Sequence, residues 1–463
     1  MKLKSSKKTI LVLVLALIMT TGMFSGCTGS KESSNNADVK TVTVWSGNTH
    51  SKNVVQELVD EFNNGVGKEK GIAIDYQVKD SSSYNQTIEL ALQSGEAPDM
   101  FTTTLVKAVE NDYVLPLEEL PGGEDFLKKY KSYEREKTNT YQGKHYCVPI
   151  GIVTQGLIYN KDMFVEAGIV DKNGEAKAPE TWDEVREYAK KLTNEKEMKY
   201  GIVFPIKWSG WYASDIHAPL MSSAGFLGYN PVNGKYDFSK LQPITEAIMG
   251  IKADKSYYPG AEGMDNDPAR AYFASGNVGM KFAFSFDYGV LTEQFPAECE
   301  WGVAPYPVVD KNEKYKQRAD YGQSFLINKK SLETVGGEAL MEVYKFFTGD
   351  DYAIAMYKAG MTIPYDFDIV KDVKLDKRME QWKEFAKLAD ISSVYPLEPS
   401  KDALIAANPY NTFVNEVWPG KMTPAEFVKK LETSYTKAAD EYYKQNPNEN
   451  RDSLINKDWN IKR

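Results

Sequence analysis

Apolar and polar residues alternate in the first part of the chain in a pattern that predicts strands separated by helices. Residues 41–45 and 72–78 alternate with a period of two, as half-buried strands do. Apolar residues recur at helical spacing over 54–62, and a second helix is predicted over 84–93, before a short strand that ends at Phe101. This order of strands and helices predicts a parallel sheet with right-handed crossovers.

The carboxyl ends of the strands in such a sheet are where ligands bind. Trp45–Asn48 follows the first predicted strand, and Asp99 and Thr102–Thr104 flank the third. We therefore expect these three segments to lie near one another on a binding edge.

The middle and the end of the chain predict further strands and helices. A helix should begin after Thr181, because Asp183 and Glu184 in its first turn suit the positive end of the helix dipole. Its core face is expected to consist of Val185, Tyr188, Ala189 and Leu192. The other predicted elements are strands at 146–150, 156–160, 278–284 and 301–307, and helices at 161–168, 269–276, 376–390 and 423–445.

The first 26 residues predict a secretory signal. They combine a lysine-rich start, an apolar run over 10–19 and small residues before Cys27. The run is too short to span a bilayer core of roughly 30 Å. The ending resembles the bacterial lipobox, with Phe24 in place of the usual leucine, which implies cleavage before Cys27 and a lipid on its thiol. The alternative is an ordinary signal with an incidental cysteine. The polar residues 27–39 predict a flexible tether.

Composition narrows the classes of partner. The net charge of −9 argues against nucleic acid and anionic lipid headgroups. With 3 His and 3 Cys, we expect neither a transition-metal site nor a cofactor. The chain is rich in aromatic residues, with 29 Tyr, 8 Trp and 20 Phe, and amphipathic rings that face a cleft suit sugars and other ring-shaped ligands. The part beyond Lys40 is long enough for two lobes.

Seven short motifs, in this order, resemble one family. They are Gly95–Met100, Val148–Pro149, Leu157–Ile169, Pro179–Glu184, Tyr272–Met280, Trp301–Pro307 and Gly360–Pro364. Each motif is weak by itself, but their order behind a lipoprotein-like signal is specific. From Thr41 to about Tyr443 the chain is similar to the extracellular solute-binding proteins of ABC sugar importers, the maltose-binding-protein-like group (family 1), of the lipoprotein type.

The resemblance implies a two-lobed α/β fold of the periplasmic-binding-protein type (class II-like), in which hinge strands cross between the lobes. The implied crossings lie near 147–151, 299–304 and 362–366. Lobe one would then be 40–148 and 303–363, and lobe two 150–300 and 365–463. Periplasmic binding proteins close their two lobes around a ligand by a hinge motion, so the same motion is expected of this chain.

The implied function is capture of a carbohydrate, specifically an oligosaccharide, and its delivery to the membrane subunits of an ABC permease. The protein would perform no chemistry on its ligand. It would be a monomer at the extracellular face of the bacterial cell membrane, held there by a lipid anchor on Cys27.

The candidate ligand-binding residues are aromatic rings for the apolar faces of a sugar and polar side chains for its hydroxyls. Trp208 and Trp211 flank Ser209-Gly210, which favours a loop in which their rings could stack on the ligand. The alternative for these two residues, and for Trp45, is packing in the core. Phe286 stands near the position of a Gly-Trp pair common in the family. The full set is Trp45, Asn48, Tyr84, Asp99, Gln155, Trp208, Trp211, Tyr212, Phe286, Asp287, Tyr321, Gln323 and Tyr410.

Two other functions and one covalent feature stay open at this point. A binding protein for another solute, such as a polyamine, would need acidic pairs that the candidate loops do not clearly show. A secreted glycoside hydrolase would need two carboxylates about 5–10 Å apart, and no such arrangement stands out. Cys147 and Cys299 both lie in predicted hinge strands, so they form either a disulfide or two separate buried thiols.

Overall fold

The computed structural model of the protein describes residues 39–463, except positions 50, 81–82, 323–324, 397 and 400–406. Cys27 lies outside the described residues, together with the predicted signal and most of the tether, and so does Gln323. Within the described ranges, none of the helices is both long enough and apolar enough to cross a membrane.

The first sheet has four strands in the order β15-β3-β1-β2. β1 (Lys40–Ser46) pairs in parallel with both β2 (Ile72–Val78) and β3 (Met100–Phe101), which confirms the predicted parallel arrangement. β15 (Leu326–Ile327) comes from much later in the chain and adds to β3 in the antiparallel direction. The carboxyl end of β1 therefore meets the carboxyl end of β3 at one edge of the sheet.

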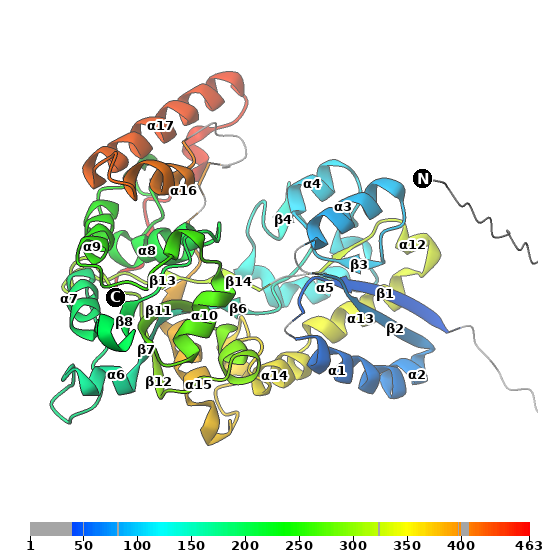
Figure 1. Cartoon of the computed structure of the whole chain (residues 1–463). Helices are drawn as coiled ribbons and strands as arrows, with labels where there is room; N and C mark the ends of the chain where they lie inside the picture. The colour runs from blue at the N-terminus through cyan, green and yellow to red at the C-terminus, as the bar shows by residue number, and fades with distance from the viewer. Residues whose placement is uncertain (1–38, 50, 81–82, 323–324, 397, 400–406) are drawn as a thin grey trace, which may run out of the picture. The chain divides into compact units, whose positions relative to one another are not determined.

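Helices cover both faces of this sheet. α1 (Lys52–Asn64) and α13 (Gly337–Thr348) pack against the buried valines of β1. α3 (Tyr84–Ser94) and α4 (Leu105–Glu110) pack around Phe101 on the opposite face. Figure 1 shows the two pairs of helices on opposite sides of the strands.

The second sheet has the order β12-β7-β11-β8. β7 (Gln155–Asn160) pairs antiparallel with β11 (Val278–Phe284) and with β12 (Trp301–Ala304), and β8 (Tyr200–Ile202) pairs with β11 in parallel. The strand predicted at 278–284 is confirmed over its full length.

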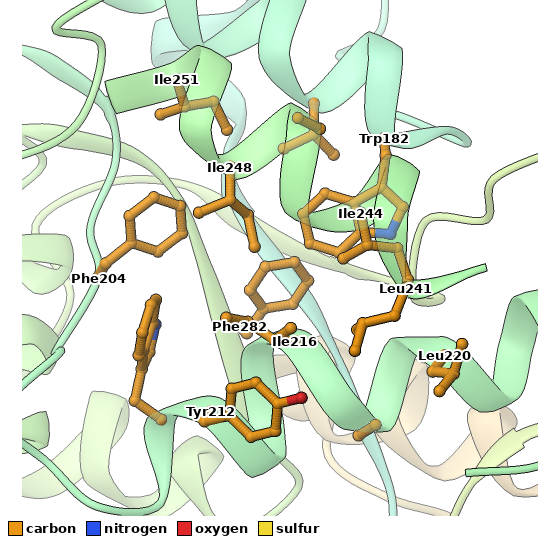
Figure 2. Close-up of a cluster of buried hydrophobic side chains, with 14 of the residues drawn as sticks. Trp182, Phe204, Tyr212, Ile216, Leu220, Leu241, Ile244, Ile248, Ile251 and Phe282 are labelled. Atoms are coloured by element: carbon orange, nitrogen blue, oxygen red, sulfur yellow. The ribbon is translucent and has the colours of Figure 1, made fainter. Parts of the chain in front are cut away.

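Helix α7 (Trp182–Leu192) shows why the local sequence folds as it does. The Thr181 hydroxyl accepts a hydrogen bond from Glu184 N, and the Glu184 carboxylate accepts one from Thr181 N, which together form a capping box. The four residues predicted for its core face are all buried. In Figure 2, Trp182 points from this helix toward Phe282 of β11 and toward the isoleucines of α9 (Leu241–Ala253).

A long helix near the carboxyl terminus, α17 (Pro424–Gln445), lies where the sequence predicts it. The remaining elements are short. The short strands are β4 (Thr140–Tyr141), β5 (Lys144–His145), β6 (Ile152–Val153), β9 (Tyr229–Asn230), β10 (Lys235–Tyr236), β13 (Gln317–Arg318), β14 (Asp320–Tyr321) and β16 (Ser392–Ser393). The other α-helices are α2 (Val66–Lys70), α5 (Gly123–Leu127), α6 (Lys161–Glu166), α8 (Ala218–Ala224), α10 (Asn266–Ala274), α11 (Asp287–Gly289), α12 (Ser331–Thr334), α14 (Asp350–Lys358), α15 (Glu380–Lys387) and α16 (Pro409–Thr412). The π-helical segments are η4 (Tyr212–His217), η6 (Val290–Gln294) and η11 (Phe413–Val417).

The crossing between the two sheets differs in one place from the expectation. β12 pairs with β7, and β13 pairs with β16, so the chain from 301 to 318 belongs to the second sheet and its surroundings. The chain returns to the first sheet only after β14, which pairs with β6. The prediction that lobe one resumes at 303 therefore places this crossing too early.

Two predicted elements take other forms. Residues 146–150 are largely buried, but no strand is assigned there, because this segment runs between the two sheets instead of pairing in either. The long helix predicted at 376–390 is interrupted: only α15 is α-helical, and 3₁₀ turns at Lys377–Met379 and Leu388–Ile391 flank it. Apolar periodicity alone does not register such changes of pitch.

Candidate ligand-binding cleft

A cavity of about 500 Å³ lies at the carboxyl edge of the first sheet. Its walls come from the segment after β1 with Thr102 after β3, the crossing strand β6, the turn and π-helical segment after β11, and α14 with the residues that follow it. The polar lining residues are Ser46, Asn48, Thr49, Ser51, Tyr76, Thr102, Glu293, Gln294 and Thr362, and the larger apolar ones are Val55, Ile150, Ile152, Val153, Phe286, Val290, Phe325, Tyr352, Met356 and Met361.

A second cavity of about 290 Å³ adjoins the first. Thr102 and Gly322 line both cavities, so the two share a boundary. The second cavity adds the side chains of Asn85, Thr103, Thr104, Leu105, Thr138, Asn139, Cys147, Pro149 and Leu326. Ser46–Asn48 and Thr102–Thr104 thus meet at one edge, as the parallel strand order predicts. Together the two cavities form a cleft whose lining mixes polar and apolar side chains.

The Tyr84 side chain connects the two strand ends that form this edge of the sheet. Its hydroxyl donates to Trp45 O at 3.1 Å and accepts from Thr102 N at 3.1 Å, so it links the end of β1 to the end of β3. Burial raises the pKa of Tyr84, so the hydroxyl keeps its proton. Gly47 packs on the same ring, since a Cβ there would lie 2.8 Å from Tyr84 Cγ. Tyr84 is buried, and its place is that of a support for the edge and not of a direct ligand contact.

Phe286 forms an aromatic wall of the larger cavity. Its ring stacks on Phe284 with centroids 5.0 Å apart and planes within 7°. Trp208 meets Phe284 edge-on at 6.2 Å, and the guanidinium of Arg270 lies 5.9 Å from the Phe286 ring. Trp208 is half-buried and does not line the cavity itself. Gly210 lies against its indole, where a Cβ would come within 2.3 Å of Cζ2. The rings of Phe284 at the end of β11, Phe286 in the following turn and Trp208 therefore form a single cluster beside the cleft.

Trp211 and Tyr212 do not reach the cleft, contrary to the prediction. Trp211 is fully buried, and it packs edge-on against Phe204, Phe413 and Trp418. Tyr212 lies in the buried cluster shown in Figure 2. The reason is local: the π-helical segment η4 begins immediately after Trp211 and directs both rings into the core, although Ser209 and Gly210 favour an exposed loop.

Asp287 and Gln155 are also buried and engaged within the protein, which corrects their assignment as ligand contacts. Asp287 pairs with Arg270 and accepts a hydrogen bond from Phe284 N at 3.0 Å. The Gln155 amide donates to Asp320 Oδ2 at 2.7 Å and accepts from the Tyr306 hydroxyl at 2.8 Å. Their polar atoms hold the cleft walls in place.

Asp99 lies at the amino end of β3, whereas the binding edge is formed by the carboxyl ends of the strands. It precedes β3, and its carboxylate accepts from Thr43 N at 2.7 Å and from the Ser331 hydroxyl at 2.6 Å. Trp45 is half-buried, and the ammonium of Lys79 lies 4.0 Å from its ring centroid. The Lys79 ammonium therefore lies where a stacked sugar would have to sit on that face.

Tyr410 lies apart from the cavity lining. The Tyr410 hydroxyl donates to the backbone of the Trp208 loop, at Ile206 O (2.9 Å) and Lys207 O (3.2 Å). The backbone of Tyr321 pairs with Ile152 in β14. Of the predicted site residues that the structure describes, Asn48 and Phe286 are the ones that line the cavity.

Sequence reasoning missed the residues that follow Phe286. Glu293 and Gln294 reach the cavity from η6, a π-helical segment whose wider turn has no apolar periodicity that could reveal it. Thr362 could have been found, since it lies in a predicted crossing. Among the described residues, no group of three or more His, Cys, Asp or Glu could hold a metal ion. Cys147 and Cys299 are both thiols and are not joined to each other, so the structure does not support the disulfide hypothesis.

Comparison of the sequence with characterised proteins finds distant relatives. A maltotriose-binding protein of Pyrococcus abyssi is 24% identical over 297 residues, which cover 62% of this chain and 59% of the relative. The melibiose/raffinose/stachyose-binding protein MelE of Bacillus subtilis is 24% identical over 318 residues, 65% of this chain and 68% of MelE. The diacetylchitobiose-binding protein DasA of Streptomyces coelicolor is 23% identical over 427 residues, 88% and 92% of the two chains. The chain thus spans less than two thirds of the maltotriose-binding protein.

Solved structures share the fold. The GacH receptor of Streptomyces glaucescens matches with a TM-score of 0.67 at 20% identity, covering 87% of this chain and 99% of GacH. The MalE domain of Bdellovibrio bacteriovorus matches with a TM-score of 0.64 at 16% identity, covering 86% and 100%. The fold is therefore the two-lobed α/β fold of maltose-binding-protein-like structures.

The family assignment rests on a match that spans most of the described chain. The model of the bacterial extracellular solute-binding proteins matches residues 46–354, a range that contains the second sheet, the first sheet apart from most of β1, and nearly all of the cleft lining. The chain belongs to the bacterial extracellular solute-binding proteins, a family of transport components that bind their solutes without transforming them.

Proposed function

We propose that the protein captures an oligosaccharide in the cleft and delivers it to the membrane subunits of an ABC permease. The observation that carries this proposal is the composition of the cleft: hydroxyl and amide groups line it beside the stacked pair Phe284–Phe286. A sugar offers hydroxyls to the first kind of group and an apolar C–H face to the second.

The size of the cleft and the named relatives support the same ligand class. The larger cavity, at about 500 Å³, falls in the range of roughly 300–1,000 Å³ that is usual for small-molecule sites. The adjoining cavity lengthens the site, which suits a chain of sugar units better than a single one. The relatives are named for binding maltotriose, raffinose-type sugars and diacetylchitobiose.

Delivery would depend on closure of the lobes. Strand β6 pairs with β14 and, through Ile152, with Ile363 at the crossings, and its two residues line the cleft. A ligand that contacts both walls binds the closed form better than the open form and shifts the population toward it. The permease would recognise the closed form of a monomeric protein.

A lipid on Cys27 would hold the protein at the extracellular face of the cell membrane. The signal-like residues 1–26 and the polar tether 27–39 support this part of the proposal. A short tether keeps a binding protein at a high effective concentration beside its permease.

Ligand screening tests the proposed ligand class. A neutral oligosaccharide should raise the unfolding temperature of the purified chain, because a ligand that binds only the folded state stabilises it by mass action. Asn48→Ala should weaken binding, since its side chain lines the cavity, whereas Asn64→Ala on the exposed end of α1 should not. Stabilisation by spermidine and by no glycan would refute the carbohydrate assignment.

Fatty-acid labelling tests the anchor separately. Cells that express the full chain should incorporate labelled palmitate into it, and the protein should fractionate with membranes. Cys27→Ser should lose both properties, while Cys299→Ser should keep them. Equal labelling of the wild type and Cys27→Ser would refute lipidation at this position.

A further inference from the structure

The lining of the cleft is nearly free of charge. Among the described residues that line its two cavities, there is no lysine, arginine or histidine, and Glu293 provides the one charged side chain. The described lining therefore offers hydrogen-bond donors and acceptors but no positive charge that could pair with an anion.

Two cations close to the cleft walls, Arg270 and Lys79, make contacts within the protein. Arg270, behind the Phe286 ring, is buried and paired with Asp287 and with Asp267. Lys79, beside the end of β1, donates to Gln77 Oε1 at 2.8 Å and lies over the Trp45 ring. An anionic ligand in the cleft could bind Arg270 only if the buried ion pair between Arg270 and Asp287 broke. The free energy lost with that buried pair is far larger than the free energy gained from an exposed ion pair.

We propose that the cleft selects neutral oligosaccharides and rejects glycans that carry a carboxylate, sulfate or phosphate, with Glu293 as the residue that repels them. This inference rests on the proposed carbohydrate function and narrows its ligand class. An acidic glycan would lose the hydration of its anionic group on entering the cleft, and the lining residues that the structure describes hold no positive charge that would compensate for this loss. Glu293 adds direct repulsion between like charges.

The two effects differ in size and can be separated. Desolvation without a partner is the larger effect, and we expect an acidic derivative to bind at least about tenfold more weakly than its neutral parent. Glu293 is exposed, so solvent screens its repulsion, and removing its charge should recover only about threefold of that difference. This smaller part should disappear as ionic strength rises.

Matched pairs of ligands test the proposal by calorimetry with the purified chain. The probes are maltotriose, raffinose and diacetylchitobiose, together with a derivative of each that is oxidised to a uronic acid at one C6. The variants are Glu293→Gln and, as the control, Glu69→Gln, whose exposed carboxylate on α2 lines neither cavity. Glu293→Gln should narrow the affinity difference between each acidic derivative and its neutral parent, whereas Glu69→Gln should leave that difference as in the wild type.

The outcomes distinguish the two proposals. Weaker binding of the acid than of its neutral parent, with the gain confined to Glu293→Gln, supports charge selection. An acidic derivative that binds as tightly as its parent overturns charge selection but leaves the carbohydrate function in place. If no glycan of either kind binds and a non-sugar solute does, both proposals fail.

Discussion

The buried ion pair between Arg270 and Asp287 allows a sharp prediction about stability, because it supports the aromatic wall of the cleft. The side chains are 8% and 1% exposed. Asp287 accepts from Phe284 N, and Arg270 lies behind the Phe286 ring. Asp287→Asn keeps an acceptor for Phe284 N but removes the negative charge, so it isolates the charge from the hydrogen bond.

The expected cost follows from what remains around Arg270. Breaking a buried pair by removing one partner costs about 3–5 kcal/mol, since the other charge stays buried. Asp267 still contacts Arg270 at 2.7 Å, but it is 58% exposed, and such contacts contribute about 0–1 kcal/mol. We therefore expect Asp287→Asn to lower the free energy of unfolding by about 3 kcal/mol, and Asp267→Asn by less than about 1 kcal/mol.

Urea unfolding of three variants tests this reasoning. The third variant, Arg270→Met with Asp287→Asn, removes both charges and should recover most of the loss, because an apolar replacement of a buried pair is often neutral. A loss below about 1 kcal/mol for Asp287→Asn would show that Arg270 finds its compensation elsewhere. A double variant that is no more stable than Asp287→Asn would show that the two residues do not act as a pair.

Three further predictions follow from the burial of particular side chains. Trp211→Ala should lower the free energy of unfolding in urea by about 3–5 kcal/mol, as expected for a large core residue. Trp208→Ala should mainly weaken oligosaccharide binding in calorimetry, by up to about tenfold, since its ring supports the Phe284–Phe286 stack. The reverse pattern would contradict both placements. Burial raises the pKa of Asp215 to about 7 from 3.8, so the folded state holds a proton that the unfolded state releases between about pH 4 and pH 7. Stability should fall as pH rises through this window, and Asp215→Asn should remove that part of the slope; equal slopes in urea titrations would refute it. In denaturant without reductant, Cys147 and Cys299 should both react with a thiol reagent. In the folded state both should react slowly, because Cys147 is buried and burial raises the pKa of Cys299 to about 12. Fewer than two reactive thiols from these positions in denaturant would reveal a disulfide.

The regular parts of the fold could be predicted because their signals are local. The alternation in 72–78 and 278–284 matches β2 and β11 to the residue, and Thr181 with Glu184 marks the start of α7. The parallel strand order also brings Ser46–Asn48 to Thr102 at the cleft. These features depend on side-chain period and capping, which neighbouring residues determine.

The candidate site is harder to predict because orientation depends on tertiary packing. Ser209 and Gly210 favour a loop, but the π-helical segment that follows turns Trp211 into the core and leaves Trp208 half-buried beside Phe284. Asp99 precedes β3, and its carboxylate binds Thr43 N and the Ser331 hydroxyl, a partner more than 200 residues away that only the folded chain brings together with it. The Asp287 carboxylate could accept a hydrogen bond from a sugar hydroxyl, but in the folded chain it forms an ion pair with Arg270. Because Arg270 lies elsewhere in the sequence, the sequence does not reveal this pairing.

Calorimetric titration with neutral oligosaccharides tests the central claim most directly. The purified chain should bind at least one of maltotriose, raffinose and diacetylchitobiose saturably at one site per chain. Phe286→Ala, which removes the aromatic wall of the cavity, should weaken that binding while the folded chain keeps its secondary structure. Absence of binding to every oligosaccharide, together with saturable binding of spermidine, would contradict the account.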